Sequence, residues 1–432
     1  MKSKLVAIIL LLVILLLAIL LAGSSQGRGE SNAALGDRLQ KAMDESLKNS
    51  GAIGVSAAVM MPDGWLWQGA AGISHEGVPL TTAMLFCIAS VQKNLQAALA
   101  LRLIQEGRLA LDDPLDKWLP AYPNIDGKIT VRQLLNLTSG IDNFVEDQNS
   151  PWRIGYKNIG FEKWWTWEEI LAAFIGPANF KPGERCAYST TNYIVLRLII
   201  EKASRSRQAN ELRRRLLKPN HLNHTLADFK KPIPKGMVIA HGWCDTDGDG
   251  QADDISGHSL NWIASIAPML VYSTPGDMVR WMNALYHKKT VLNHELLKAM
   301  LSFVGPVQNE PLMKGYGLGV VDINLGLMIP KWDGVACHGH LGSEIGYTTF
   351  VGYFPDYGVS LAVMFNRGCD RDTDRAVMTV GAAVTDALFK HLGVPESKPK
   401  DPVSQKTVSG NIFDSPRRWP IRQRIDRTYA DG

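Results

Sequence analysis

Residues 347–365 read YTTFVGYF-PDYG-VSLAVMF, two apolar runs on either side of Pro355-Asp356-Tyr357-Gly358. Both runs are rich in β-branched and aromatic side chains, and short segments of this composition bounded by Pro and Gly favour β-strands. We therefore predict strands over Tyr347–Phe354 and Val359–Phe365, joined by this turn.

A second strand pair is predicted near the other end of the chain. Ile53–Met61 and Trp65–Ala71 are joined by a Pro-Asp-Gly turn, and Gly315–Leu325 is a further strand candidate. The chain from about residue 88 to about residue 300 has mainly helical patterns and long polar loops. Because strands and helices do not alternate regularly, the order of segments indicates an antiparallel sheet.

Two amphipathic helices are predicted at the ends of this region. Leu35, Leu39, Met43 and Leu47 recur at every fourth position, which indicates a helix over 33–47. The segment 375–392 is also expected to form an apolar-faced helix. The predicted fold class is α+β: an antiparallel β-sheet flanked by terminal helices, with an inserted, mainly helical region.

Composition and charge exclude several classes of protein. The 432 residues are 46% hydrophobic, which rules out a disordered or fibrous chain. The net charge of +4 belongs to Lys2, Lys4 and the basic segment 395–432, so the rest of the chain is nearly neutral. No broad basic surface for nucleic acid is expected. One internal basic cluster is interpreted as a solvated helix face; its members are Arg205, Arg207, Arg213, Arg214, Arg215 and Lys218.

The N-terminus has the order of an export signal. Lys2 and Lys4 precede the uninterrupted apolar run Leu5–Ala22, and small residues follow at Gly23-Ser24-Ser25. Cleavage after Ser24 and retention as a membrane anchor both fit a run of this length, and either outcome places the protein in the periplasm or outside the cell. The predicted organisation is 1–24 signal or anchor, 25–32 polar linker, 33–392 a single catalytic domain and 393–432 a basic, disordered tail.

The cysteines are widely spaced and contain no CxxC pair, so zinc and dithiol redox sites are not supported. An oxidising compartment would allow one or two disulfides and leave at least one thiol free, and the sequence does not assign the pairs. The five cysteines are Cys87, Cys186, Cys244, Cys337 and Cys369.

Ser90-Val91-Gln92-Lys93 is the first candidate for chemistry. It begins a predicted helix to about Gln105. Residues three apart share a helix face, so Lys93 can act as the base that a neutral serine needs. An S-x-x-K match is weak evidence by itself, because about one such match is expected by chance in a chain of this length. The non-catalytic interpretation is that Ser90 is a helix N-cap and Lys93 an exposed lysine.

Two further blocks change that assessment. Tyr188-Ser189-Thr190-Thr191-Asn192-Tyr193 follows Lys181-Pro182-Gly183, and His340-Leu341-Gly342 is expected to lie just before a late strand. These blocks, in this order, resemble the serine β-lactamase and penicillin-binding superfamily, in particular its class C-like branch of DD-peptidases, esterases and β-lactamase-related hydrolases. Supporting stretches at 106–114, 134–140 and 272–278 resemble the same branch, and the resemblance covers roughly residues 33–392.

The resemblance implies a β-lactamase/transpeptidase-like fold and a set of roles. Ser90 would attack a carbonyl to form an acyl-enzyme, and Lys93 and Tyr188 would share the proton transfers. His340 would occupy the first position of the third motif and act as a further catalytic residue. Backbone N–H groups of Ser90 and Ser343 would form the oxyanion hole, and Gly342 would let substrate lie along the strand edge. No cofactor is implied for catalysis.

One position departs from the family pattern. The second motif is often Tyr-x-Asn, and here its third residue is Thr190. A hydroxyl cannot reproduce the simultaneous donor and acceptor of an amide. Together with His340 and Leu341, this weakens the prediction of efficient β-lactam hydrolysis.

An acidic loop is a candidate cation site. The segment 245–254 reads DTDGDGQADD, with oxygens spaced as in a Ca²⁺ loop but without the usual Glu at the last position. A structural Ca²⁺ site and a solvated acidic turn are both open interpretations. The candidate ligands are Asp245, Asp247, Asp249 and Asp253.

The sequence thus predicts an exported serine hydrolase that forms an acyl-enzyme on Ser90, with D-alanyl-D-alanine carboxypeptidase-like activity on peptidoglycan-type peptides as the first expectation. An esterase, amidase or weak β-lactamase acting on small molecules is the enzymatic alternative. An inactive relative that binds peptidoglycan is the non-enzymatic one. The partners expected are the substrate and, through the N-terminus alone, the membrane. Three tryptophans, Trp164, Trp165 and Trp167, are interpreted as helix packing in preference to a cleft lining.

Overall fold

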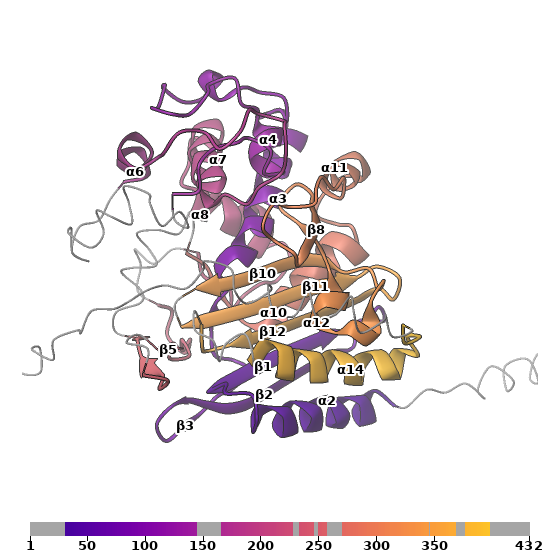
Figure 1. Cartoon of the computed structure of the whole chain (residues 1–432). Coiled ribbons are helices and arrows are strands. Elements are labelled where there is room, and N and C mark those ends of the chain that lie inside the picture. Colours follow the sequence, from indigo (N-terminus) through magenta and orange to yellow (C-terminus); the bar gives the residue numbers. More distant parts are fainter. Residues whose placement is uncertain are drawn as a thin grey trace, which may run out of the picture.

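A computed structural model describes residues 31–144, 166–227, 233–245, 249–256, 270–344, 346–368 and 376–397. Its centre is an antiparallel sheet in which the described strands follow the order β3-β2-β1-β12-β11-β10-β9-β8 (Figure 1). The strand bounds are β1 (Gly54–Met60), β2 (Leu66–His75), β3 (Val78–Pro79), β8 (Met313–Tyr316), β9 (Val321–Ile323), β10 (His338–Glu344), β11 (Tyr347–Phe354) and β12 (Val359–Phe365).

The hairpin predicted at 347–365 is confirmed with its bounds, and it lies in the middle of the sheet. β12 pairs on one side with β11 and on the other with β1, so that Ala58 faces Ala362 in the register. All residues of β12 are buried. The pairing of β12 with β1 therefore joins the strands from both ends of the chain, as the fold class predicts.

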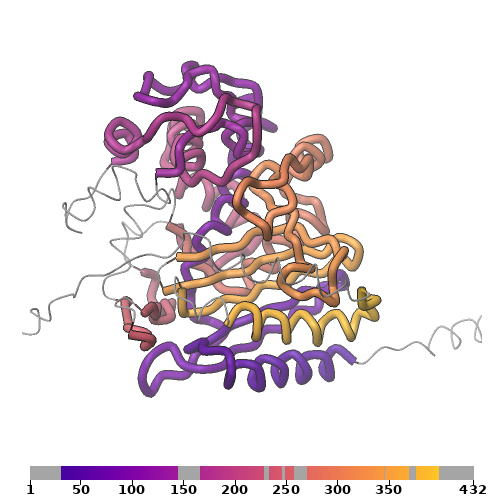
Figure 2. Tube along the Cα trace, viewed as in Figure 1, coloured from indigo at the N-terminus to yellow at the C-terminus, as the bar shows by residue number. Residues whose placement is uncertain are grey.

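The terminal helices pack together on one face of the sheet. α2 (Asn32–Leu47) begins at Ser31, whose side chain accepts a hydrogen bond from the Ala34 N–H, a helix N-cap. Its buried residues Leu35, Leu39 and Met43 are those of the predicted apolar stripe. α2 contacts β2 and α14 (Ala382–Leu392), and Figure 2 shows these indigo and yellow segments side by side.

α10 (Pro275–Met282) covers the opposite face, where it contacts β1, β11 and β12. The inserted region lies on the β10 side of the sheet and is mainly helical (Figure 1). Its described helices are α3 (Gln92–Gln105), α4 (Val131–Leu135), α6 (Trp167–Ala173), α7 (Thr190–Ser204) and α8 (Gln208–Leu212), with the short helices η1 (Ala89–Val91), η2 (Leu115–Lys117) and η3 (Arg213–Leu217).

The remaining short elements connect these layers. They are the strand pairs β4 (Phe86–Cys87) with β7 (Tyr272–Ser273) and β5 (Trp243–Cys244) with β6 (Asp253–Asp254), and the helices η4 (Asn283–His287), α11 (His294–Met300), α12 (Leu325–Met328), η5 (Pro330–Trp332) and η6 (Val377–Gly381). Among the described residues, no helix combines the length and apolar character that a membrane span requires.

Three expectations from the sequence are corrected. The predicted strand Gly315–Leu325 is two strands, β8 and β9, separated by a turn in which Gly319 has φ 74°. His340 lies within β10 and not before a strand. Arg215 is not part of a solvated face: its side chain is 5% exposed and it pairs with Glu106 and Glu211.

Disulfides are also not found among the described cysteines. Cys87, Cys186, Cys244 and Cys337 are buried free thiols, and Cys369 lies outside the described residues. Burial raises the pKa of the Cys87, Cys186 and Cys337 thiols above the usual range. Because the thiolate is the reactive form, these cysteines act as unreactive packing groups.

Candidate active site

Ser90 lies at the entry to α3, in a strained stretch of backbone. β4 pairs with β7, and the Ile88 N–H donates to the Val271 carbonyl at 3.0 Å. The next residue, Ala89, has φ 45°, a left-handed conformation that disfavours side chains other than Gly, Asn or Asp. Such strain persists only where surrounding contacts hold it, and it is typical of functional positions.

Gly342 of β10 is one of these contacts. A Cβ atom at Gly342 would lie 2.4 Å from the Ile88 carbonyl oxygen and 3.2 Å from Ala89 Cβ. The absence of a side chain therefore lets β10 approach the backbone that presents Ser90. The role expected from the family resemblance, in which Gly342 lets substrate lie along the strand edge, remains a prediction.

The structure brings Ser90, Lys93 and Tyr188 together. Lys93 Nζ donates to Ser90 Oγ at 2.9 Å, and the Tyr188 hydroxyl lies 2.8 Å from the same oxygen. Ser90 and Tyr188 are partly exposed, so the nucleophile can be reached from solvent. Two proton-carrying groups within hydrogen-bond distance of one hydroxyl are the arrangement that activates a serine.

The Lys93 ammonium is enclosed by aromatic rings. Its side chain is 1% exposed, and Nζ lies 4.9 Å from the Tyr188 ring centroid and 5.8 Å from that of Tyr193. Ring faces stabilise a cation, whereas burial favours the neutral amine that a base must provide. The non-catalytic interpretation of Lys93 as an exposed helix lysine is therefore wrong.

His340 is fully buried behind Tyr188, and both of its ring nitrogens are engaged. Nδ1 lies 2.6 Å from the Leu341 carbonyl, which can only accept, so Nδ1 carries the proton. Nε2 then accepts from the Tyr316 hydroxyl at 3.0 Å. Burial, reinforced by the charge of Lys93 and opposed by the Leu341 carbonyl, lowers the pKa of His340 to about 3. His340 is thus a neutral acceptor.

Tyr316 and Tyr193 complete this buried layer, and the sequence did not single out Tyr316. Their hydroxyls are 3.4 Å apart, and the Tyr193 hydroxyl donates to the Leu135 carbonyl at 3.0 Å. Burial raises the pKa of both phenols well above the usual range, so they remain protonated donors. The Tyr316 ring contacts Tyr188 edge-on, with centroids 6.4 Å apart. The layer holds Tyr188 from behind.

Thr190 begins α7 and is fixed through its backbone. Its N–H donates to Asn143 Oδ1 at 3.0 Å, and the Thr191 hydroxyl donates to the Asp142 carbonyl at 2.6 Å. The neighbouring Ser139 hydroxyl donates to Asn192 Oδ1 at 2.7 Å. The stretch 134–140 therefore supports the second motif, and Asn143 is a residue near the site that the sequence did not indicate.

Ser343 is exposed on β10, opposite Thr348 of β11. β9 pairs with β10 only at His338 and Gly339, and η1 contacts β10 beyond that point. The end of β10 that carries Ser343 therefore faces the Ser90 turn. Its backbone N–H as an oxyanion donor remains a prediction from the family resemblance.

The acidic loop is separate from these residues. Asp245 Oδ2 accepts from the Gly250 N–H at 3.1 Å, Asp249 Oδ1 accepts from the Gln251 N–H at 2.7 Å, and Asp253 lies in β6. Asp247 is outside the described residues. No cluster of three or more metal-binding side chains occurs within the part of the chain that is described. Trp164 and Trp165 also lie outside the described residues. The Arg197 guanidinium carbon lies over the Trp167 ring, 5.4 Å from the ring centroid.

Comparison with known proteins agrees with this geometry. Penicillin-binding protein 4* of Bacillus subtilis is 26% identical over 76% of this chain and 69% of its own length. Esterase EstB of Burkholderia gladioli is 32% identical over 40% of this chain and 46% of its own. Among solved structures, the D-stereospecific amidohydrolase of Streptomyces sp. has a TM-score of 0.64 with 27% identity, covering 81% of this chain and 98% of that one. The D-amino acid amidase of Ochrobactrum anthropi SV3 has a TM-score of 0.69 with 23% identity, covering 83% and 99%.

The antiparallel sheet, the helices that enclose it and these relatives define a serine hydrolase of the β-lactamase and penicillin-binding superfamily. The Beta-lactamase family model matches residues 39–384, and the chain belongs to that family.

Proposed function

We propose that this protein is an exported serine hydrolase that forms an acyl-enzyme on Ser90 and cleaves amide bonds in D-alanyl-D-alanine-type peptides. The main support for this proposal is that Lys93 Nζ and the Tyr188 hydroxyl both lie within hydrogen-bond distance of Ser90 Oγ, at 2.9 and 2.8 Å. The proposed acyl-enzyme chemistry uses only these side chains.

The proposed first step is attack of Ser90 Oγ on the carbonyl carbon. As the C–O bond forms, the hydroxyl proton moves to the neutral amine of Lys93, either directly or through the Tyr188 hydroxyl. Collapse of the tetrahedral intermediate breaks the C–N bond, and Tyr188 returns a proton to the leaving amine. Water then attacks the ester, and the same groups accept and return its proton, which releases the acid and restores Ser90.

The relatives support an amide substrate of D-configuration. Two of the similar structures are named for action on D-amino acid or D-stereospecific amides, and the Bacillus subtilis relative is named as a penicillin-binding protein.

A second candidate is hydrolysis of small esters. It is favoured by Thr190, whose hydroxyl replaces the amide that many relatives present to an acylamino side chain, and by the similarity to Esterase EstB. A weak β-lactamase activity would use the same acyl-enzyme. These possibilities differ in the leaving group and not in the nucleophile.

Covalent labelling tests the mechanism. Fluorescent penicillin or a fluorophosphonate should label the wild type, and Ser90→Ala should abolish the label, while Ser302→Ala, at an exposed serine just after α11, should retain it. If neither probe labels a folded wild-type protein, the acyl-enzyme proposal is wrong. Release of D-alanine from an acyl-D-alanyl-D-alanine peptide, compared with turnover of a nitrophenyl ester, then separates the peptidase from the esterase.

Export and calcium are proposals that rest on the sequence. Residues 1–24 should direct the protein across the membrane, so that deletion of this segment leaves it in the cytoplasm on cell fractionation. Calcium in the loop 245–254 would brace the loop, and it should then raise the melting temperature of chelator-treated protein. An unchanged melting temperature would leave the solvated acidic turn.

A further inference from the structure

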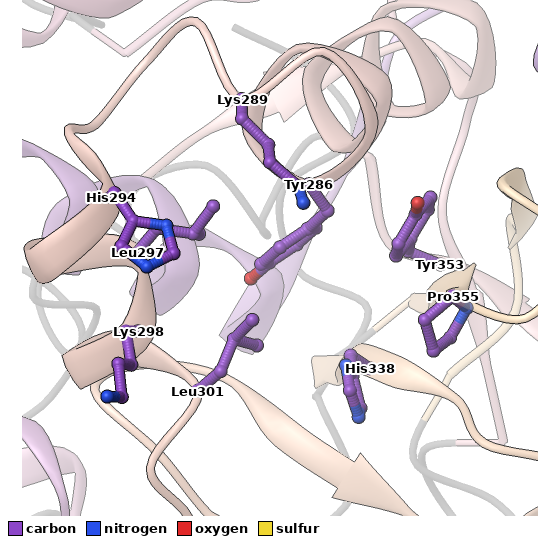
Figure 3. Close-up of a pocket in the computed structure, with 9 residues that line it drawn as sticks. All are labelled: Tyr286, Lys289, His294, Leu297, Lys298, Leu301, His338, Tyr353 and Pro355. Atoms are coloured by element: carbon purple, nitrogen blue, oxygen red, sulfur yellow. The ribbon is translucent and has the colours of Figure 1, made fainter.

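A hollow in the surface lies outside the Ser90 site. It encloses about 260 Å³ between η4, α11 and the ends of β10 and β11 (Figure 3). None of its lining residues is Ser90, Lys93, Tyr188 or His340. The volume is just below the range of about 300–1,000 Å³ typical of pockets for drug-sized ligands, so it fits a smaller molecule.

The inner wall is apolar and aromatic. The rings of Tyr286 and Tyr353 stack with centroids 5.7 Å apart, and both side chains are buried. Leu297 and Leu301 line the facing side, as Figure 3 shows. A flat or branched apolar body would exclude water from these surfaces.

The rim is cationic. Lys289, His294 and Lys298 are exposed at the mouth of the hollow, and no carboxylate is among the lining residues. Neither lysine ammonium forms an ion pair with a described residue. Lys289 also has φ 55°, a backbone conformation unfavourable for a lysine. The chain therefore places two unpaired positive charges at the opening of an apolar hollow.

Charges behind the wall do not cancel this arrangement. His338 lines the hollow, and burial lowers its pKa, so it is neutral at physiological pH. Asp322 and Asp356 oppose this lowering of the His338 pKa. Asp356 follows the lining residue Pro355 and is exposed, but it is not itself part of the lining. Asp322 lies 3.8 Å from Lys314 Nζ, outside the lining set.

We propose that this hollow is a binding site for a small carboxylate with an aromatic or branched apolar body. The carboxylate would lie between Lys289 and Lys298, and its apolar body would lie against Tyr286 and Leu297. Such a ligand matches both halves of the site, whereas a neutral molecule uses only the wall and an inorganic anion only the rim.

Ligand-observed ¹⁹F NMR with 4-fluorophenylacetate tests the proposal, in the full chain carrying Ser90→Ala to prevent turnover. We expect saturable binding with Kd in the millimolar range or tighter, and weaker binding of 4-fluorophenylacetamide, which lacks the charge. The double variant Lys289→Glu/Lys298→Glu should weaken 4-fluorophenylacetate binding about tenfold. The matched control Lys288→Glu/Lys235→Glu, which makes the same charge change at exposed lysines outside the hollow, should not.

Leu301→Trp provides an independent variant, since its larger ring would fill the hollow without changing charge. It should abolish the binding. Equal Kd values for the acid and the amide, or binding unchanged by both Leu301→Trp and the double lysine variant, would overturn the proposal, as would the absence of saturable binding.

Discussion

His340 is the residue for which the structure most changed the interpretation. The sequence placed it in the third motif as a catalytic group. In the structure, Nδ1 and Nε2 are bonded to the Leu341 carbonyl and the Tyr316 hydroxyl, so neither nitrogen is left to exchange protons with substrate. We infer that His340 positions Tyr316, and through it Tyr188, and that its neutrality avoids repulsion of Lys93.

This burial makes stability depend on pH. The pKa of His340 is lowered to about 3 in the folded protein, against about 6.5 when unfolded, so the unfolded chain binds the extra proton between these values. Stability from this group is therefore fully present above about pH 6.5 and is lost as pH falls toward 3. We expect a slope of roughly 1 kcal/mol per pH unit between about pH 4 and pH 6.

Urea denaturation at a series of pH values measures the slope. His340→Gln removes the titrating ring and should flatten the curve in this window. The exposed His294 provides the control, since His294→Gln should leave the slope as in the wild type. Equal slopes in wild type and His340→Gln would show that other groups dominate.

At the scale of elements, the approach of β10 to η1 is the contact on which the site depends. Gly342→Ala would put a Cβ 2.4 Å from the Ile88 carbonyl oxygen, far inside normal contact, so β10 or the Ser90 turn must move. A displacement near 1 Å in a catalytic group can lower the rate about 100-fold, and we expect a fall in kcat/KM of that order.

A matched glycine in η6 separates this effect from a general one. A Cβ at Gly381 would meet nothing within 4 Å, so Gly381→Ala should keep wild-type activity. Nitrophenyl ester turnover of the two variants, with circular dichroism to verify folding, makes the comparison. Full activity in Gly342→Ala would mean that this approach does not position Ser90.

Local patterns were sufficient to predict most elements. β11 and β12 have the predicted bounds, and the buried stripe of α2 is the one expected from spacing. The exception at Gly315–Leu325 has a tertiary cause. A Cβ at Gly319 would lie 2.3 Å from Ala97 Cβ and 2.9 Å from the Lys93 carbonyl, so the turn forms where it meets α3. Gly319 is far from Ala97 and Lys93 in the sequence, so no local sequence pattern can predict these contacts.

Arg215 shows the same limit for charge patterns. Within its basic cluster it cannot be distinguished from Arg214, yet the Arg214 side chain is 63% exposed and that of Arg215 only 5%. The difference comes from Glu106, which is 109 residues away in sequence and whose pKa is lowered chiefly by its hydrogen bond to Arg215.

The two arginines should therefore differ in stability. Arg215→Ala leaves the buried Glu211 carboxylate without this partner and should lower the free energy of unfolding by about 3 kcal/mol. Arg214→Ala removes a side chain that is 63% exposed and leaves Arg215 as the partner of Glu211, so it should change the free energy of unfolding by less than about 1 kcal/mol. Urea midpoints at constant m-value measure both. Similar values for the two would indicate that Arg215 is solvated, as the sequence suggested.

At the scale of the whole molecule, the site is assembled from distant parts of the chain. Ser90 follows β4, Tyr188 precedes α7 and His340 lies in β10, and the sheet that aligns them is joined at β1 and β12. The resemblance could predict this set of residues from motif order. It could not indicate the buried layer of Tyr316 and Tyr193, because single tyrosines in a sequence more often belong to a core than to a site.

The closing helix should be essential to this assembly, although it contributes none of the catalytic residues. Phe389 of α14 contacts the rings of Trp332 and Phe354, with centroids 5.3 and 4.9 Å away, and α14 packs on α2. Each buried large apolar side chain contributes about 1.5–3 kcal/mol, so loss of Val384, Leu388 and Phe389 approaches the whole stability of about 5–15 kcal/mol of a typical domain.

Two truncations test this dependence. A chain ending at Ser397 keeps α14 and the bonds from Ser397 to the Lys331 and Asp333 carbonyls, at 2.8 and 2.5 Å. It should melt cooperatively and keep wild-type ester turnover. A chain ending at Gly381 should lose both the transition and the activity. Because α14 contributes none of the catalytic residues, an active protein ending at Gly381 would show that the inserted region and the remaining strands hold the site without the terminal helix pair.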